Sequence, residues 1–347
     1  MTEPMTDNDK SELASLKEFS SRIGADPLLI QGAGGNTSVK FGDTMWIKAS
    51  GTQLKDALAR DLFVCVHWRD IAASVHDDLK RADRPQEFQI AGELKPSIET
   101  CLHAVLSHSV VIHVHCVDTI ALAMRQNAPS LFETKLAGFN WAFVPYLKPG
   151  GPLAAGVASV AKPETDVFVL GNHGLIVAAN STQEAEALLN RVVDCLRTYP
   201  TPLESPQDTS SLNALHEKYV TPNADHPLSR LAQSKPLLDL ALSGGLYPDQ
   251  VLFCGPRLIS MTSEENVAQV IASKVGPELD DPVMILVHGE GALLRRDAAG
   301  TELAMATSVG DVMLRVPEDA ALTYIPEDEC AALLNWDAEK YRRTINT

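Results

Sequence analysis

The sequence predicts an α/β protein with two domains. The chain has 347 residues, which is more than a single hydrophobic core usually holds. Short apolar, β-branched runs alternate with segments of helical periodicity along most of its length. A stretch rich in Pro, Thr and Ser interrupts the pattern, and its prolines are Pro200, Pro202, Pro206, Pro222 and Pro227. We therefore expect a first domain over residues 1–200, a linker over 201–227 and a smaller α/β domain over 228–347.

The first domain begins with a segment of helical spacing. Apolar residues recur from Leu13 to Ile23 at intervals of three and four, so we expect a helix over 9–23 with Asp9 or Ser11 as its N-cap. The further elements that we expect are strands over 37–41, 44–49, 62–67, 110–115, 143–145, 166–170 and 175–179, and helices over 98–106, 118–124 and about 181–196.

The second domain repeats this alternation on a smaller scale. We expect helices over 228–242, 266–275 and 301–316, and strands over 250–254 and 283–287. Residues 166–180 and 282–297 also share an order of features, since each contains an apolar run, a glycine-containing turn and a second apolar run before a helix. In such an alignment Glu290 takes the place of His173. Duplication and chance both remain explanations of this likeness.

Composition and charge exclude several classes of function. The formal net charge is −16, and no run of Lys and Arg is longer than a pair, so we expect no binding to nucleic acid. No apolar run reaches the length of about 20 residues that crosses a bilayer. The N-terminus lacks the pattern of a signal peptide. The six cysteines are scattered and suit a reduced state, so we expect a cytoplasmic protein.

A pair of histidines is the sharpest chemical feature. Side chains two apart on a strand point to the same side, so His113 and His115 would project together as ligands for a divalent metal. The spacing by itself fits two unrelated histidines equally well. His173, in a turn flanked by Gly171 and Gly174, adds a third candidate. Three histidines with an open coordination position are typical of a catalytic zinc site.

Two loops carry groups suited to a substrate. The glycine-rich stretch from Gly32 to Ser38 contains Asn36 and resembles a cradle of backbone amides for an anion, although it lacks the features of a nucleotide-binding loop. Residues 49–51 offer a second hydroxyl and amide. Both stretches also fit simple turns.

A carboxylate lies near the start of an expected helix. Ser97 could cap that helix or bind an anion. Glu99 suits the helix dipole and, taken alone, has a weak claim to be a catalytic base. We interpret His103, one turn later, as a packing residue or as support for the site.

Taken in order, the segments GAGGNTSV, KASG, KPSIET, HVH and NHGLIV resemble the class II aldolase/adducin family. The resemblance covers residues 10–200. Within the family the chain looks most like the aldolase part of bifunctional rhamnulose-1-phosphate aldolase/alcohol dehydrogenase proteins, as WIKASG, PSIETCLHAVL and VPYLKPGG indicate. The resemblance implies a three-layer α/β/α fold with a central, mainly antiparallel sheet. It leaves the smaller C-terminal α/β domain without a known role.

The resemblance also implies roles for single residues. His113, His115 and His173 match the metal-binding histidines of the family, and Glu99 matches its catalytic acid/base. Four further positions match residues that hold the substrate phosphate: Asn36, Ser50, Gly51 and Ser97. Two departures concern the substrate. Ile98 stands where some members have a second phosphate-binding serine. No tyrosine can be matched to the one that a neighbouring subunit contributes, and Tyr146 is only the nearest candidate.

These roles imply a class II, zinc-dependent aldehyde-lyase that cleaves a ketose or ketose 1-phosphate through a metal-stabilised enediolate. Zn²⁺ is the expected cofactor, although another divalent transition metal could replace it. The family also contains 4-epimerases, dehydratases, decarboxylases and non-enzymatic, adducin-like interaction proteins, which stay open as alternatives. The implied partners are a small sugar or sugar phosphate and further copies of the chain in a homotetramer, with no membrane.

Overall fold

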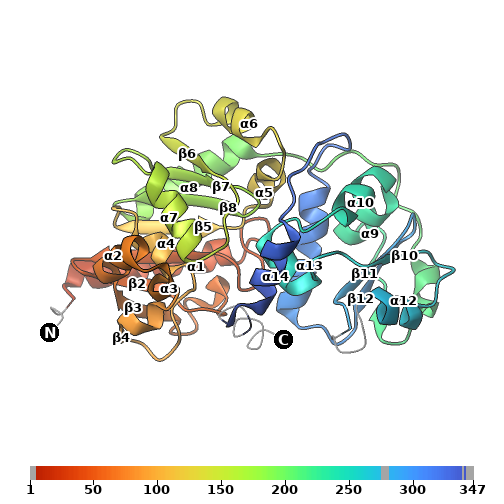
Figure 1. Ribbon diagram of the computed structural model, residues 1–347, viewed down its shortest axis with the longest axis horizontal. Helices are drawn as coiled ribbons and strands as arrows, with labels where there is room; N and C mark the ends of the chain where they lie inside the picture. The colour runs from red at the N-terminus through yellow and green to blue at the C-terminus, as the bar shows by residue number, and fades with distance from the viewer. Residues whose placement is uncertain (1–4, 275–280, 338–339, 341–347) are drawn as a thin grey trace. The chain divides into compact units, whose positions relative to one another are not determined.

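The computed structural model describes residues 5–274, 281–337 and 340, which fold into two compact units (Figure 1). Unit 1 consists of the residues up to Thr119 together with Ala128–Arg197. Unit 2 consists of Ile120–Asn127 and the residues from Thr198 onward. Among the described helices, none combines the length and the apolar character that crossing a membrane would require.

Unit 1 is built on an eight-stranded sheet in the order β4-β3-β2-β1-β5-β8-β7-β6. Its strands are β1 (Asn36–Phe41), β2 (Thr44–Lys48), β3 (Phe63–His67), β4 (Gln89–Ala91), β5 (Val110–Val114), β6 (Trp141–Val144), β7 (Val167–Leu170) and β8 (Gly174–Ala179). All neighbouring strands run antiparallel except β6 and β7, which are parallel. The expected central, mainly antiparallel sheet is thus confirmed.

Helices cover both faces of this sheet. The helices that begin in unit 1 are α1 (Asp7–Gly24), α2 (Trp68–Asp77), α3 (Leu79–Ala82), α4 (Thr100–Ala104), α5 (Val117–Ala123), α6 (Ala128–Lys135), α7 (Gly151–Val160) and α8 (Thr182–Leu196), with short 3₁₀ turns η1 (Leu54–Asp56) and η2 (Pro85–Phe88). Helices α2, α4 and α7 share one core with alternate residues of the strands, such as Val111 and Ile176. Helices α1 and α8 pack against each other and against β1, β5 and β8. The intervening strand residues, including Ile112, are buried on that second side because strand side chains alternate between faces.

The first helix starts earlier than expected. Thr6, and not Asp9 or Ser11, is the N-cap of α1: the Thr6 hydroxyl accepts a hydrogen bond from the backbone N–H of Asp9, and the Asp9 carboxylate accepts one from Thr6 N–H. Such a capping box satisfies two backbone donors at once. The sequence signal was misread because several potential caps lie close together.

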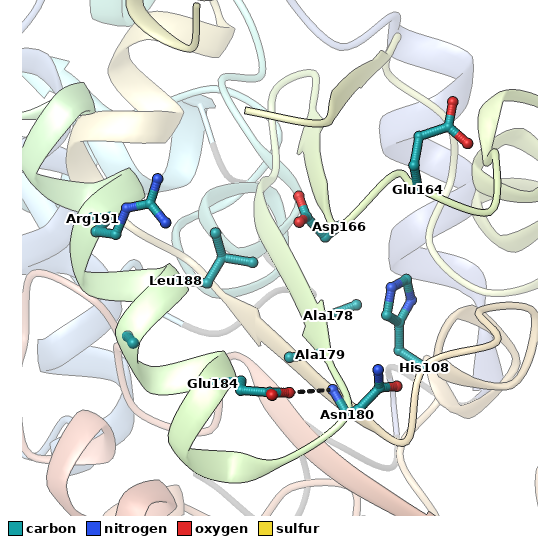
Figure 2. Close-up of a pocket in the computed structure, with 10 residues that line it drawn as sticks. His108, Glu164, Asp166, Ala178, Ala179, Asn180, Glu184, Leu188 and Arg191 are labelled. Carbon is teal, nitrogen blue, oxygen red and sulfur yellow. Dashed lines mark hydrogen bonds between the residues drawn. The ribbon is translucent and has the colours of Figure 1, made fainter. Parts of the chain in front are cut away.

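A cavity of about 410 Å³ opens elsewhere on unit 1 (Figure 2). Its lining includes His108, Asp166, Glu184 and Arg191. The sequence analysis proposed none of these four as a site residue. Burial raises the pKa of Asp166 and lowers the pKa of His108. The lining of the cavity mixes charged with apolar side chains and includes none of the residues expected to bind metal.

Unit 2 contains a four-stranded sheet in the order β10-β11-β12-β9. Its elements are η3 (Ser210–Ala214), β9 (Tyr219–Val220), α9 (Pro227–Gln233), α10 (Lys235–Leu242), α11 (Pro248–Cys254), β10 (Ser260–Met261), α12 (Val267–Lys274), β11 (Met284–Val287), β12 (Gly291–Arg295), α13 (Gly300–Met313) and α14 (Glu327–Asn335). Residues 201–227, expected as a linker, contribute η3 and β9 to this unit.

Two expected elements of unit 2 differ in the structure. Residues 250–254 were expected as a strand but form part of helix α11, in which every residue is buried. A short, fully buried run shows no periodicity that separates helix from strand. The single helix expected over 228–242 is two helices, because Ser234 caps α10 and Pro236 in its first turn removes a backbone donor. The helix expected over 266–275 is α12, and position 275 lies outside the described residues.

The two similar sequence segments have the same construction. In one hairpin Leu170 pairs with Gly174, in the other Val287 pairs with Gly291, and each hairpin precedes a helix. The turn residues Asn172 and Gly289 both have positive φ, of 53° and 74°. Each first strand also pairs in parallel with an earlier strand, β6 or β10, and each second strand pairs antiparallel with another, β5 or β9. Unit 2 therefore repeats the strand arrangement of half of unit 1.

Candidate metal centre

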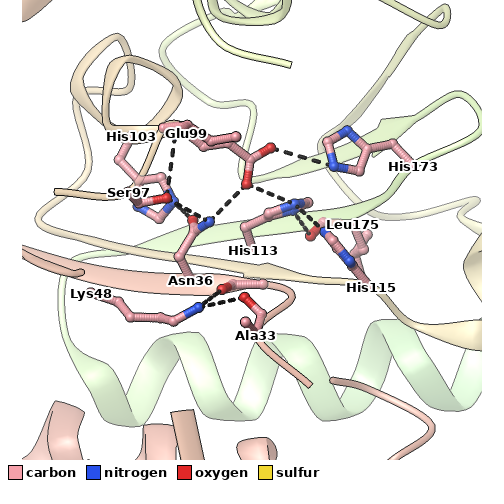
Figure 3. Close-up of polar contacts among 12 residues, drawn as sticks. Ala33, Asn36, Lys48, Ser97, Glu99, His103, His113, His115, His173 and Leu175 are labelled. Atoms are coloured by element: carbon pink, nitrogen blue, oxygen red, sulfur yellow. Dashed lines mark hydrogen bonds and ion pairs between the residues drawn. The ribbon is translucent and has the colours of Figure 1, made fainter. Parts of the chain in front are cut away.

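Strand β5 and the β7–β8 turn bring the three histidines together (Figure 3). His113 lies on β5 and His115 follows it, so their side chains project from the same side. His173 lies in the turn, next to Asn172, whose left-handed φ of 53° tightens the chain. The turn approaches β5 closely, because a Cβ at Gly174 would stand only 2.4 Å from the carbonyl oxygen of Val114. A glycine is required there.

The imidazoles form a nearly equilateral triangle. The ring centroids are 4.9 Å apart for His113 and His115, 5.0 Å for His113 and His173, and 5.1 Å for His115 and His173. The Nε2 atoms of His113 and His115 are 3.1 Å apart. On the other side of its ring, His113 Nδ1 lies 3.1 Å from the carbonyl oxygen of Leu175. A carbonyl can only accept, so Nδ1 carries the proton and Nε2 offers its lone pair to the centre.

Glu99 faces the triangle from the loop that precedes α4 (Figure 3). One carboxylate oxygen, Oε2, lies 3.5 Å from His113 Nε2, and the other, Oε1, lies 3.4 Å from His173 Nε2. Among the described residues, no group donates a hydrogen bond to Oε1, although this atom is buried. Glu99 and the three histidines each offer one ligand atom, and these atoms all lie within 4.8 Å of one another.

This donor set fits a divalent metal ion. Three imidazole nitrogens and a carboxylate oxygen are ligands that zinc and similar ions accept. All four residues are buried, and a buried carboxylate oxygen without a hydrogen bond is costly unless a cation satisfies it. Burial raises the pKa of Glu99, but the neighbouring His113, His173 and His115 outweigh burial and lower this pKa to about 2. A bound cation would favour the carboxylate in the same direction.

Two of the four expected substrate-binding residues lie beside Glu99. Asn36 Nδ2 donates to Glu99 Oε2 at 2.7 Å and lies 3.2 Å from the hydroxyl oxygen of Ser97. That hydroxyl accepts a hydrogen bond of 3.3 Å from the backbone N–H of Glu99. Ser50 and Gly51 follow β2, and Ser50 N–H donates to the carbonyl of Lys95 at 2.8 Å, which places them beside the loop that carries Ser97.

Sequence reasoning missed Lys48, which holds the two loops in place. Its buried ammonium group donates hydrogen bonds of 2.8 Å to the carbonyl oxygens of Ala33 and Gly35 in the glycine-rich stretch. Its own carbonyl accepts a bond of 3.1 Å from Ser97 N–H. The signal was available, since a lysine at the end of an apolar strand is seldom buried without partners.

Replacing this lysine should destabilise the fold. Lys48→Met leaves the carbonyls of Ala33 and Gly35 without this donor, which should lower the free energy of unfolding by at least about 2 kcal/mol. Urea denaturation followed by circular dichroism measures the change. Lys55→Met, at an exposed position nearby, is the control and should change stability by less than about 0.5 kcal/mol. Equal stability of the two variants would contradict the role given to Lys48.

The comparisons with known proteins bear on the first half of the chain. The family model described as "Class II Aldolase and Adducin N-terminal domain" matches residues 20–199. Among curated proteins, the "Uncharacterized oxidoreductase YuxG" of Bacillus subtilis is 29% identical in an alignment of length 204, and the match covers 49% of this chain and 28% of that protein. The chain thus spans less than a third of the length of this relative.

Solved structures of similar fold match a comparable share of the chain. The N-terminal class II aldolase domain of a conserved protein from Thermoplasma acidophilum is 27% identical, with a TM-score of 0.48, and the match covers 56% of this chain and 95% of that one. A sugar-phosphate aldolase from Thermotoga maritima is 16% identical, with a TM-score of 0.43, over 55% of this chain and 95% of that one.

Proposed function

Because this chain belongs to the class II aldolase and adducin family, we propose that it is a metal-dependent aldehyde-lyase that cleaves a ketose or a ketose 1-phosphate. The observation that supports this best is the group of three converging imidazoles faced by a buried carboxylate. Metal and base are the two components that aldol cleavage requires, since a carbanion forms beside a carbonyl and a proton must be moved.

The proposed metal ligands are His113, His115 and His173, each through Nε2. Zn²⁺ is the ion that three neutral imidazoles favour, with manganese, cobalt or iron as substitutes. A divalent cation held there would supply Lewis-acid stabilisation of the negative charge that develops next to the substrate carbonyl. The carbonyl of Leu175 keeps the His113 ring in the orientation and tautomer that this role needs.

Glu99 is the proposed acid/base. Positive charge at the centre, on the imidazoles or on a bound cation, favours the ionised carboxylate, and the imidazoles when charged lower the pKa of Glu99 to about 2. A substrate that enters between Glu99 and the imidazoles weakens this interaction and raises the pKa toward the range in which a carboxylate accepts a proton well. Asn36 holds Glu99 Oε2 and leaves Oε1 facing the centre.

The proposed binding groups for the rest of the substrate are Asn36, Ser50, Gly51 and Ser97. They offer an amide, two hydroxyls and a backbone N–H, which suit phosphate or sugar hydroxyl oxygens. Ile98 adds no polar group where a second serine would strengthen binding of a phosphate. Free ketoses and ketose 1-phosphates are therefore both candidates.

Product analysis tests the reaction. The protein, loaded with zinc, is incubated with a panel of ketoses and ketose 1-phosphates, and a released aldehyde is trapped with a hydrazine reagent. Aldolase activity predicts an aldehyde together with dihydroxyacetone or its phosphate. An epimer, a dehydrated product or released CO₂ without aldehyde would assign the chain to the epimerases, dehydratases or decarboxylases of the same scaffold.

The two similar hairpins provide a matched test of metal binding. His173 and Glu290 occupy equivalent turn positions. The backbone N–H of each donates a hydrogen bond of 3.1 Å to the carbonyl oxygen of the last residue of the preceding strand. His173→Ala should remove a ligand and empty the site, whereas Glu290→Gln should leave about one ion per chain. Elemental mass spectrometry after dialysis measures both. Metal loss in the Glu290 variant alone would move the site to unit 2.

A further inference from the structure

A buried chain of hydrogen bonds runs from Ser38 on β1 to the carboxylate of Glu99, and Figure 3 shows its part from His103 through Asn36 to Glu99. Ser38 Oγ lies 2.7 Å from His103 Nδ1, and His103 Nε2 contacts Asn36 Oδ1. The amide nitrogen of Asn36 then donates to Glu99 Oε2 at 2.7 Å. The four side chains interleave because Asn36 and Ser38 are two apart on a strand, while Glu99 and His103 are one helical turn apart.

The carboxylate fixes the direction of every hydrogen bond in this chain. Asn36 Nδ2 lies within hydrogen-bond distance of both Glu99 Oε2 and the Ser97 hydroxyl oxygen, so the Asn36 amide turns its NH₂ group toward Glu99. Asn36 Oδ1 then faces His103 and accepts, which requires the proton of the imidazole to lie on Nε2. His103 Nδ1 is left as an acceptor, and the Ser38 hydroxyl must donate to it.

The alternative arrangement is costly. A proton on His103 Nδ1 would set a bare Nε2 against Asn36, so the amide would turn over and present its oxygen to Glu99 Oε2. Two acceptor oxygens would then face each other in a buried place, where unsatisfied polar groups cost most. Ser38 and His103 are fully buried, so water does not reach them to supply a substitute donor.

We propose that Ser38 and His103 are positioning residues, which lock the Asn36 amide and thereby aim Glu99 at the metal centre. This inference rests on the function proposed for Glu99. Its structural part, the tautomer of His103, is independent of any reaction. Burial also lowers the pKa of His103, so a neutral ring with a single proton is the form present at neutral pH.

The tautomer is tested by ¹⁵N NMR of histidine-labelled protein. His103 should show a protonated Nε2 and a bare Nδ1, and its signals are assigned by their loss in His103→Gln. Asn36→Leu, which removes the acceptor of the Nε2 proton, should increase the Nδ1–H form, because Nδ1–H can still donate to the Ser38 hydroxyl, while Ser38→Thr, which keeps the hydroxyl, should retain the Nε2–H form. A proton on Nδ1 in the unmodified protein, or no difference between these two variants, would overturn the proposal.

Kinetics test the consequence for Glu99. Ser38→Ala should lower kcat/KM about 10- to 100-fold, with metal content little changed. His103→Leu should lose at least as much, and His103→Gln should lose less, since its amide can still donate to Asn36. Equal losses in the Leu and Gln variants would contradict the positioning role. A protein that cleaves no sugar but keeps the Nε2–H tautomer would refute the proposed function and leave the hydrogen-bond assignment intact.

Discussion

His113→Ala should reduce bound metal from about one ion per chain to nearly none. His113 stands at the centre of the site, because its Nε2 lies 3.1 Å from that of His115 and 3.5 Å from Glu99 Oε2. Loss of a residue that only supports a metal ligand typically costs about 10- to 100-fold in affinity, so loss of a ligand should cost more. Isothermal titration with zinc and elemental mass spectrometry of the purified protein measure the effect.

His108→Ala is the matched control. His108 is a half-buried histidine of the same unit, but it lines the separate cavity of Figure 2 and contributes nothing to the group of four. The control variant should keep its metal. If the His113 and His108 variants bound zinc equally well, the proposed site would be wrong, and an adducin-like role in protein interaction would gain support.

Glu99→Gln should lower the rate of sugar cleavage by about 10²- to 10⁴-fold while the metal remains bound. The amide keeps the shape of the side chain and can still accept the hydrogen bond from Asn36, but it cannot take up a proton. The three imidazoles stay in place to hold the ion. Steady-state kinetics on the substrate found by product analysis, beside a metal determination, separate these two effects.

An exposed carboxylate in the preceding loop provides the control for Glu99. Glu93→Gln removes one negative charge close in sequence but should leave the rate within about twofold, as surface substitutions have small effects. A Glu99 variant as active as this control would assign the proton transfer to another group. Loss of metal in the Glu99 variant would instead make the carboxylate an essential ligand.

Local patterns predicted most of the fold of unit 1. Continuous apolar, β-branched runs located β5, β7 and β8. The antiparallel pairing of β1 with β2 follows from the short turn at Gly42 and Asp43. The patterns failed in α11, a short buried run whose apolar residues do not distinguish a helix from a strand. They also missed the division between α9 and α10, since the apolar periodicity continues across Ser234.

For the site, too, local sequence patterns predicted some features, while others depend on the folded arrangement of the chain. The sequence could predict that His113 and His115 lie together, because residues two apart on a strand point to the same face. The partners of Lys48 and the contact of His103 with Asn36 could not be predicted, because they depend on which strands become neighbours and on how α4 lies over β1. Such contacts arise only once the chain has folded.

An anomalous difference map from crystals grown with zinc is the most direct test of the proposed centre. We expect one peak per chain in unit 1, about 2.0–2.1 Å from the Nε2 atoms of His113, His115 and His173. A peak at another group, such as His108 and Asp166, would contradict it, as would crystals with zinc in the solution and no peak among these three histidines.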